Sequence, residues 1–272
     1  MNNLYKGISD IESSLLFSFK EIGKNIITPE DVVAQIECNI NHAYVILHNL
    51  VKKGWLFRLK RGKYLVLTKN GDEFSEDPLN IISEIIKDYY ISYISALNFY
   101  GFTEQVPATI FVNVTKRMKS INYGAQQIKF ISIGKKKFFG YEEINYGKIK
   151  IKMADKEKAL IDSLDKSEFN GGILEIIKCF DNAKKNIEIN KIVNYGLIIK
   201  ERALLRRLGL ILDLIGLKLP MELENKMMEI VKQVRYYTLL DPMRDSKGTL
   251  NKKWMIKINI PKSELFYWRK RI

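Results

Sequence analysis

The stretch NINHAYVILHNLVKKGWLFRLKRGKYLVL, residues 39–67, decides the fold of the first part of the chain. Its first half predicts a helix, because Asn39 can cap it and apolar residues recur at helical spacing until Gly54 stops it. Its second half contains two β-prone runs joined by Arg61 and Gly62, a pattern that indicates a β-hairpin. The stretch therefore predicts a helix followed by a hairpin with a basic tip.

Two more helices are expected upstream of this stretch. Ser9 and Glu12 form a capping-box pattern ahead of apolar residues at helical spacing. Thr28 and Pro29 supply an N-cap and a proline at the first position of a short second helix. Three short helices and a hairpin are the order of a winged helix-turn-helix. In that fold the third helix enters the major groove of DNA.

The charge of this part of the chain is one-sided. The 272 residues include 45 Lys and Arg against 31 Asp and Glu, a formal net charge of +14, and residues 38–71 contain no acid. Such a field attracts phosphates, and asparagine can bond bidentately to adenine. A lysine-rich genome and a protein-binding winged helix are the alternatives. The candidate DNA-binding residues are Asn41, His42, Tyr44, His48, Asn49, Lys52, Arg58, Lys60, Arg61 and Lys63.

A polar, acidic segment that ends at Pro78 predicts a boundary near residue 75. It gives a winged-helix domain over residues 1–75 and a larger domain over residues 76–272. Helical spacing then covers residues 79–100, and strand-like and helical runs follow, so the fold class is α+β. The further expected strands are 110–115, 128–133 and 149–153, and the further expected helices are 156–164, 173–183 and 200–217.

Basic residues also cluster in the larger domain. They predict a second surface for DNA, or for RNA, with solvated charged turns as the alternative. Arginines four positions apart share a helix face and could continue such a surface, although a role in packing between helices is the favoured interpretation for that segment. The candidates for this second basic surface are Lys116, Arg117, Lys119, Lys135, Lys136, Lys137, Arg202 and Arg206.

A combination of motifs along the chain resembles one protein family. The motifs are GWLFRLKRGKY at 54–64, YISYISAL at 90–97, EQVP at 104–107, TKR at 115–117, FFG at 138–140, ADKEKALID at 154–162 and LLRRLG at 204–209. Together they are similar to the AbiEi antitoxins of abortive-infection operons. The resemblance spans most of the chain, but the basic aromatic tail FYWRKR at 266–271 matches none of its motifs.

The resemblance implies a repressor of its own operon. Its winged helix is expected to bind inverted repeats in the promoter, and its C-terminal domain is expected to supply antitoxicity. The implied partner gene encodes a nucleotidyltransferase toxin of the AbiEii type, which the antitoxin counteracts without a stable complex. A plain winged-helix transcriptional regulator is the alternative.

Motifs for catalysis are missing from the sequence. There is no Walker-type loop, no His-Glu-x-x-His and no Gly-x-Ser-x-Gly, and the two cysteines and two histidines lack metal-ligand spacing. We therefore expect no enzymatic activity, cofactor, metal or small-molecule substrate. One enzymatic alternative is a metal-dependent nuclease, because magnesium prefers carboxylates. Its candidate ligands are Asp155, Glu157, Asp162 and Asp165.

The expected location is the cytoplasm. The first residues lack the basic and apolar regions of a signal peptide. No run of 18 apolar residues occurs, so the sequence predicts no insertion into a membrane.

Overall fold

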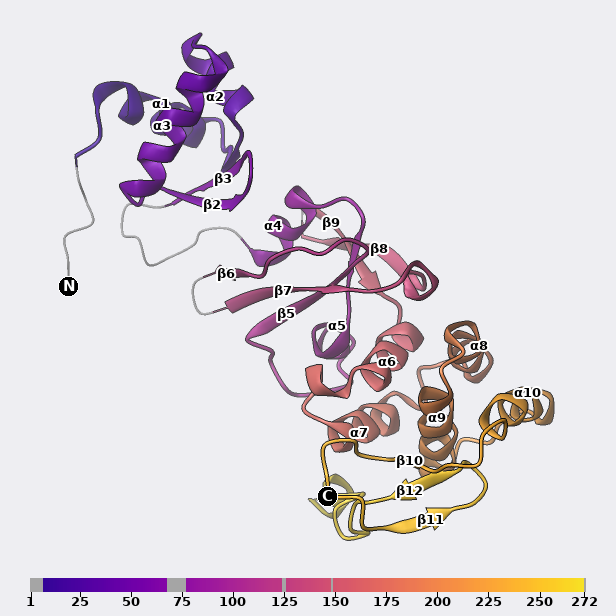
Figure 1. The fold of residues 1–272 in the computed structure, drawn as a ribbon. Coiled ribbons are helices and arrows are strands. Elements are labelled where there is room, and N and C mark those ends of the chain that lie inside the picture. The colour runs from indigo at the N-terminus through magenta and orange to yellow at the C-terminus, as the bar shows by residue number, and fades with distance from the viewer. Residues whose placement is uncertain (1–6, 68–76, 124–125, 148, 272) are drawn as a thin grey trace. The chain divides into compact units, whose positions relative to one another are not determined.

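The computed structural model describes residues 7–67, 77–123, 126–147 and 149–271 (Figure 1). The chain divides into two compact units, residues 1–87 with 121–127 and residues 88–120 with 128–272. The boundary expected near residue 75 falls outside the described residues, so that division stays a prediction.

The first unit contains the expected winged helix (Figure 1). Ser9 and Thr28 each form a capping box, and the Asn39 side chain accepts a hydrogen bond from the backbone N–H of His42 at 2.9 Å. Each of these caps satisfies N–H groups that the first helical turn leaves without partners. The elements are α1 (Asp10–Glu21), α2 (Pro29–Ile36), α3 (Ile40–Lys52), β2 (Leu56–Lys60) and β3 (Lys63–Val66).

A third strand, β1 (Ile26–Ile27), completes the sheet of the winged helix. It pairs antiparallel with β3 and gives the order β1-β3-β2. Two residues are too short for an alternating pattern, so the sequence did not reveal this strand. One core under the sheet and the helices includes Leu15, Phe19, Leu47 and Leu50. This packing turns the opposite face of α3 outward.

A six-stranded sheet of order β6-β7-β5-β4-β9-β8 follows in the rest of the chain. β4 pairs parallel with β9 and antiparallel with β5, and β8 and β9 form an antiparallel pair. The strands that were expected are present, and β4, β6 and β8 are additional. The strands are β4 (Tyr89–Ile91), β5 (Thr109–Val114), β6 (Ile121–Tyr123), β7 (Gln126–Ser132), β8 (Tyr141–Tyr146) and β9 (Ile149–Ala154).

Helices surround the buried helix α6, which packs against four of them (Figure 1). A small sheet of order β10-β12-β11 closes the second unit. The helices are α5 (Tyr93–Phe99), α6 (Lys156–Asp165), α7 (Ile173–Ala183), α8 (Ile189–Ile199), α9 (Arg202–Ile215) and α10 (Met221–Val231). The strands are β10 (Thr238–Leu239), β11 (Thr249–Asn251) and β12 (Ile256–Ile258), and the short 3-10 helices are η1 (Lys135–Lys137), η2 (Ser167–Phe169) and η3 (Tyr267–Arg271).

The single helix expected over residues 79–100 is wrong. The segment instead forms α4 (Pro78–Ile85), strand β4 and helix α5. All three residues of β4 are buried and pair with β5, and Ile91 also pairs with β9. Sheet pairing of this kind outweighs a local helical pattern. Tyr93, where the chain enters α5, has a left-handed backbone with φ of 58°.

No helix within the described ranges is both long enough and apolar enough to cross a lipid bilayer.

Candidate nucleic-acid interface

The exposed face of α3 carries the residues expected to contact bases. Ala43, Leu47 and Leu50 of this helix are fully buried. The alternating exposure along α3 follows from its period of 3.6 residues, with apolar positions facing the core. The exposed side chains are Asn41, His42, Tyr44, Val45, His48 and Asn49. Their exposure agrees with the expectation, whereas contact with bases stays a prediction.

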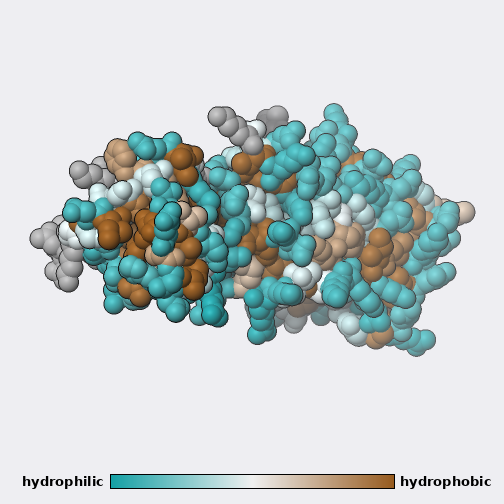
Figure 2. Space-filling model, turned by 90° about the horizontal axis from the view of Figure 1, so that it is seen from above, coloured by the Kyte–Doolittle hydropathy of each residue, from teal (hydrophilic) through white to brown (hydrophobic). Residues whose placement is uncertain are grey.

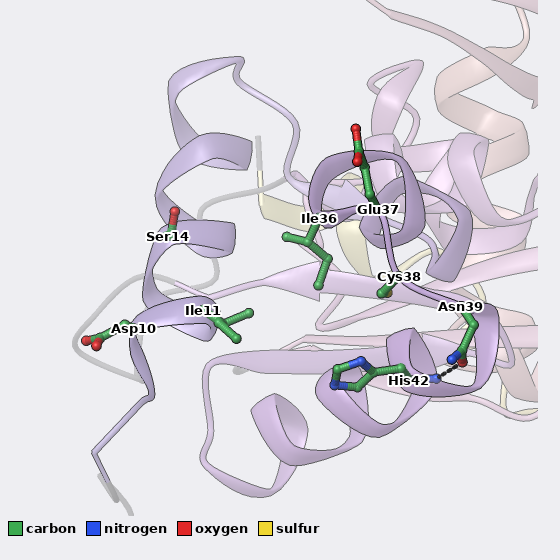
Figure 3. Close-up of a pocket in the computed structure, with 8 residues that line it drawn as sticks. All are labelled: Asp10, Ile11, Ser14, Ile36, Glu37, Cys38, Asn39 and His42. Atoms are coloured by element: carbon green, nitrogen blue, oxygen red, sulfur yellow. Dashed lines mark hydrogen bonds between the residues drawn. The ribbon is translucent and has the colours of Figure 1, made fainter.

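A turn between α2 and α3 sets the angle at which α3 is presented (Figure 3). Glu37 ends α2 with a left-handed φ of 48°, and Asn39 then caps α3. A hollow of about 710 Å³ lies beside this turn, and Ile11 and Ile36 point into it from α1 and α2 while His42 borders it from α3 (Figure 3). The first turn of α3 is therefore open on one flank.

The surface of the first unit is not uniformly polar. Brown, hydrophobic side chains gather among teal ones on this unit, at the left of Figure 2. The exposed hydrophobic residues of this unit include Phe17 of α1, which is 65% exposed, and Val45 of α3, which is 55% exposed. An apolar group on the outer face of α3 is suited to contact with the methyl group of thymine.

The wing presents a smaller set of free cations than the sequence suggested. Arg58 and Arg61 are exposed on the hairpin, and Lys52 is exposed at the end of α3. Gly62 completes the tip with φ of 75°, a conformation that side chains other than glycine rarely adopt. Lys60 is exposed as well, but its Nζ is hydrogen-bonded within the unit, unlike the charged groups of Lys52, Arg58 and Arg61.

The side-chain amines of Lys60 and Lys63 instead form hydrogen bonds within the first unit. Lys60 Nζ donates to the backbone oxygen of Ile85 at 2.5 Å, and Lys63 Nζ donates to that of Glu84. Burial and the nearby charge of Lys63 lower the pKa of Lys60. The last carbonyls of a helix carry partial negative charge, so the two lysines fasten α4 to the wing. This contact could not be predicted from the sequence, because helical spacing did not separate α4 from the residues that follow it.

Two basic turns meet at one edge of the large sheet. The backbone N–H of Ile133 donates to the oxygen of Val114 at 2.9 Å, which sets the ends of β5 and β7 side by side. The chain leaves both strands at this edge in turns rich in basic residues. The exposed cations of these turns are Lys116, Arg117, Lys119, Lys135 and Lys136.

Lys137, also a candidate for this surface, points inward. Its Nζ lies 2.7 Å from Asp165 and 2.6 Å from Glu201. Burial lowers the pKa of Lys137, but the hydrogen bonds to these two carboxylates outweigh it and raise the pKa above its ordinary value. The lysine therefore serves as a link between α6 and the start of α9.

Arg206 requires a correction, because its side chain has no exposed surface. Its guanidinium donates to the backbone oxygens of Val231, Val234 and Tyr236 at 2.7–2.9 Å and to the Thr238 hydroxyl at 3.0 Å. The helix face that it shares with Arg202 packs against the chain that follows α10. Arg206 thus holds the fold together, and a contact surface cannot include it. Arg202 is half-buried and donates to the oxygen of Ile230 at 3.4 Å.

Residues 14–66 match the family model described as a transcriptional regulator, AbiEi antitoxin. This segment is therefore similar to AbiEi antitoxins. The match runs from the first half of α1 to the last residue of β3, so it covers the exposed face of α3 and the wing. Over these residues the match confirms the resemblance to AbiEi antitoxins that the sequence motifs suggested.

The fold of the whole chain has a counterpart among solved structures. The crystal structure of the RV2827C protein from Mycobacterium tuberculosis is similar with a TM-score of 0.67 and 12% sequence identity. The similarity covers 97% of this chain and 96% of that chain, and at this identity it shows the fold alone. No curated protein matches the chain at a significant level.

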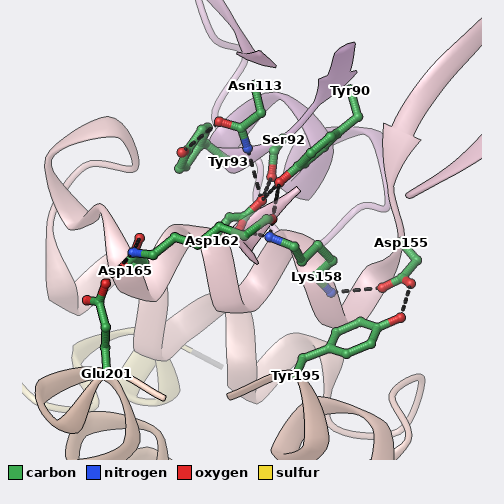
Figure 4. A network of polar contacts seen from close by, with 11 residues as sticks. Tyr90, Ser92, Tyr93, Asn113, Asp155, Lys158, Asp162, Asp165, Tyr195 and Glu201 are labelled. Carbon is green, nitrogen blue, oxygen red and sulfur yellow. Dashed lines mark hydrogen bonds and ion pairs between the residues drawn. The ribbon is translucent and has the colours of Figure 1, made fainter. Parts of the chain in front are cut away.

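The second unit contains a buried polar network centred on Asp162 (Figure 4). Its carboxylate accepts hydrogen bonds from Lys158 Nζ, from Ser92 Oγ at 2.8 Å, and from Tyr90 and Asn113 at 3.1 Å each. Burial raises the pKa of Asp162, and the charge of Lys158 acts against that rise. Lys158 Nζ also lies 4.8 Å from the centre of the Phe139 ring. The buried carboxylate of Asp162 therefore receives hydrogen bonds from four side chains.

The other acids of the nuclease alternative have separate partners. Asp155 caps α6 and accepts from the Tyr195 hydroxyl at 2.7 Å, as Figure 4 shows. Glu157 pairs with Lys191 at 2.9 Å, and Asp165 pairs with Lys137. Across the part of the chain that the structure describes, no three His, Cys, Asp or Glu side chains are grouped so that they could hold a metal ion. The carboxylates that the sequence suggested as ligands are therefore distributed over several ion pairs.

Proposed function

We propose that this protein is the repressor and antitoxin of an AbiE-type operon. Its winged helix binds inverted repeats in its own promoter, and its C-terminal unit counteracts a nucleotidyltransferase toxin of the AbiEii type without a stable complex. It acts in the cytoplasm, where the operator lies. The observation that carries the proposal is the outward face of α3, which is mostly polar, free of acids and part of a segment matching a transcriptional regulator family.

Within this proposal, the residues of the winged helix have two different roles. Asn41, His48 and Asn49 read base edges from the exposed face of α3, because amide and imidazole groups can bond to them. Arg58 and Arg61 contact phosphates, which supply affinity without sequence information. Lys60 and Lys63 contribute indirectly, by holding α4 against the wing.

Two substitutions separate these roles. Arg61→Ala removes a phosphate contact, so binding weakens about equally on operator and random DNA, and the log-log salt slope falls by about one unit. Asn41→Ala costs about 1–3 kcal/mol on the operator and leaves binding to random DNA nearly unchanged. Lys185→Ala, an exposed lysine of the second unit, is the control for loss of one positive charge. Electrophoretic mobility shifts at several salt concentrations measure all three variants. An equal loss on both DNAs for Asn41→Ala would show that α3 does not read bases.

The two basic turns at the ends of β5 and β7 form a second, sequence-independent contact to DNA in this proposal. The double substitution Lys135→Gln and Lys136→Gln is expected to reduce the salt slope by about two units and to leave the preferred sequence unchanged. The same titration with duplex RNA separates a DNA contact from an RNA contact. An unchanged salt slope on both nucleic acids would make these turns ordinary solvated loops.

No catalytic step belongs to the proposed function. Labelled DNA and RNA incubated with the protein and Mg²⁺ or Mn²⁺ are expected to stay intact. A cleavage product that disappears on Asp155→Ala would replace the proposal with the nuclease alternative. A nucleotidyltransferase gene directly downstream of the coding sequence would support the antitoxin role against that of a plain regulator.

A further inference from the structure

The C-terminal sheet and the segment that follows it enclose a hollow of about 790 Å³. It lies in the second unit, between the end of α9, strands β11 and β12 and the chain after β12. Apolar side chains form much of its wall, among them Leu214, Ile258, Ile260 and Phe266. A volume of roughly 300–1,000 Å³ is typical of sites for small molecules.

The charged groups at this hollow have one sign. Lys247 and Lys262 line it, both are exposed, and none of its lining residues is an acid. Within the described part of the chain, neither lysine takes part in an ion pair, and Glu264 is held by Arg244 at 2.8 Å. The hollow therefore combines an apolar wall with a positive rim, which is complementary to an apolar molecule with an anionic end.

The walls of the hollow are fixed in position. Gly248 lies so close to β12 that a Cβ atom at this residue would be 2.1 Å from the backbone oxygen of Ile258, so only glycine fits. On the outer side, Asp181 of α7 accepts two hydrogen bonds of 2.7 Å from Arg269 and one of 3.0 Å from Trp268. These bonds anchor the C-terminal segment that carries Phe266. A hollow with anchored walls needs little reorganisation when a ligand binds.

We propose that this hollow binds a small amphipathic anion of the alkyl carboxylate class. The alkyl chain lies against Leu214, Ile258 and Phe266, and the carboxylate lies at the rim between Lys247 and Lys262. This inference concerns the second unit alone and does not depend on the proposed DNA binding. The anchored, pocket-sized wall favours a small molecule over an acidic peptide, which becomes an outcome of the test.

Calorimetric titration of the full chain with octanoate, and with 1-octanol as its uncharged counterpart, tests the proposal. Octanoate is expected to bind saturably with one site per chain. The double substitution Lys247→Gln and Lys262→Gln is expected to weaken octanoate binding about fivefold or more and to leave 1-octanol binding unchanged, because only the charge contact is lost. The control is Lys185→Gln with Lys232→Gln, two exposed lysines of the same unit that do not line the hollow.

A second variant tests the apolar wall. Leu214→Trp fills the hollow, so binding of both octanoate and 1-octanol is expected to be lost, with circular dichroism reporting on the fold. The lysine variant changes only exposed groups, so it decides the proposal even where Leu214→Trp fails to fold. The proposal is overturned by absence of saturable octanoate binding, by equal octanoate affinity in the lysine variant, or by an acidic apolar peptide that binds and is not displaced by octanoate.

Discussion

Lys158 and Asp162 are two opposite charges that the fold removes from water together. Lys158 has no exposed surface, and Asp162 has three hydrogen-bond donors besides the lysine. Taking one charge away leaves the other without a partner in a medium of low polarity, which costs far more than an exposed ion pair contributes. The charges at positions 158 and 162 of the DKEKALID motif, residues 155–162, therefore serve the packing of α6.

Asp162→Asn is expected to lower the free energy of unfolding by about 3–5 kcal/mol, because it leaves the Lys158 ammonium buried without a counter-charge. Urea unfolding followed by circular dichroism measures the change. The double variant Lys158→Met with Asp162→Leu removes both charges and is expected to be less destabilised than Asp162→Asn alone. A double variant as unstable as the single one would show that the charges are not coupled.

Gly209 illustrates how one residue of α9 is fixed by a neighbour distant in the sequence. A Cβ atom at this position would be 2.3 Å from the ring of Trp254, which is fully buried. Gly209→Ala is therefore expected to destabilise the protein by about 1–3 kcal/mol through overpacking, although alanine favours helices. Gly134→Ala is the matched control, because that glycine has a negative φ and open space around it. Thermal unfolding compares the two, and an equal effect would contradict the packing argument.

At the scale of elements, sequence motifs predicted the helix ends that are set by contacts between residues close together in the chain. The caps at Ser9, Thr28 and Asn39 gave the starts of α1, α2 and α3 directly, because each cap is made within four residues. The separation of α4, β4 and α5 depends instead on pairing of β4 with β5 and β9, which lie about 20 and 60 residues further along the chain. A helical pattern in one window carries no information about such partners.

The candidate site follows the same rule. The exposed face of α3 was predictable, because burial of Ala43 and Leu47 sets it through helical period alone. The fastening of Lys60 and Lys63 to the end of α4 was not, and neither was the burial of Arg206. Each of these contacts is made to carbonyl groups of residues about 20–30 positions away. A basic residue in a sequence does not reveal whether its partner is a phosphate or a carbonyl group of the same chain.

The C-terminal element η3 is attached through one carboxylate. Hydrogen bonds from Arg269 and Trp268 hold the pKa of Asp181 below its ordinary value of 3.8, although burial acts against them. A carboxyl whose pKa is lowered by folding contributes stability above its ordinary pKa, and that contribution is lost as the pH falls through the folded value. This tail matched no motif of the AbiEi family, yet it forms a wall of the second unit.

Asp181→Asn is expected to lower the free energy of unfolding by about 1–2 kcal/mol at pH 7, because the charge-assisted bonds to the partly exposed Arg269 are lost. The difference from the unsubstituted protein is expected to shrink as the pH is lowered below 3.8. Urea titrations of both proteins at several pH values measure this dependence. Asp245→Asn, an exposed aspartate of the same unit, controls for loss of one negative charge. A difference that grows on acidification would show that the carboxylate does not anchor the tail.

At the scale of the whole molecule, the two compact units suggest two separable activities. The winged helix has its own core, and the family match ends within it, at residue 66. The acidic segment ending at Pro78 suggested a division near residue 75. The structure adds a reason to place a working boundary later, because α4 belongs to the first unit and its last carbonyls accept hydrogen bonds from Lys60 and Lys63.

Two fragments, residues 1–75 and 1–87, are therefore expected to differ in stability and to agree in DNA preference. The longer fragment keeps α4 against the wing and should unfold at a higher temperature, by an amount that Lys60→Met with Lys63→Met abolishes. Both fragments should bind operator DNA, more weakly than the full chain, because the exposed face of α3 is present in each. Residues 79–272, expressed with the toxin from an unrelated promoter, should still protect cells. Loss of protection in every chain that lacks the winged helix would contradict this division. Antitoxicity would then require α3 and the wing even where no operator is repressed, so DNA binding and antitoxicity would be one activity.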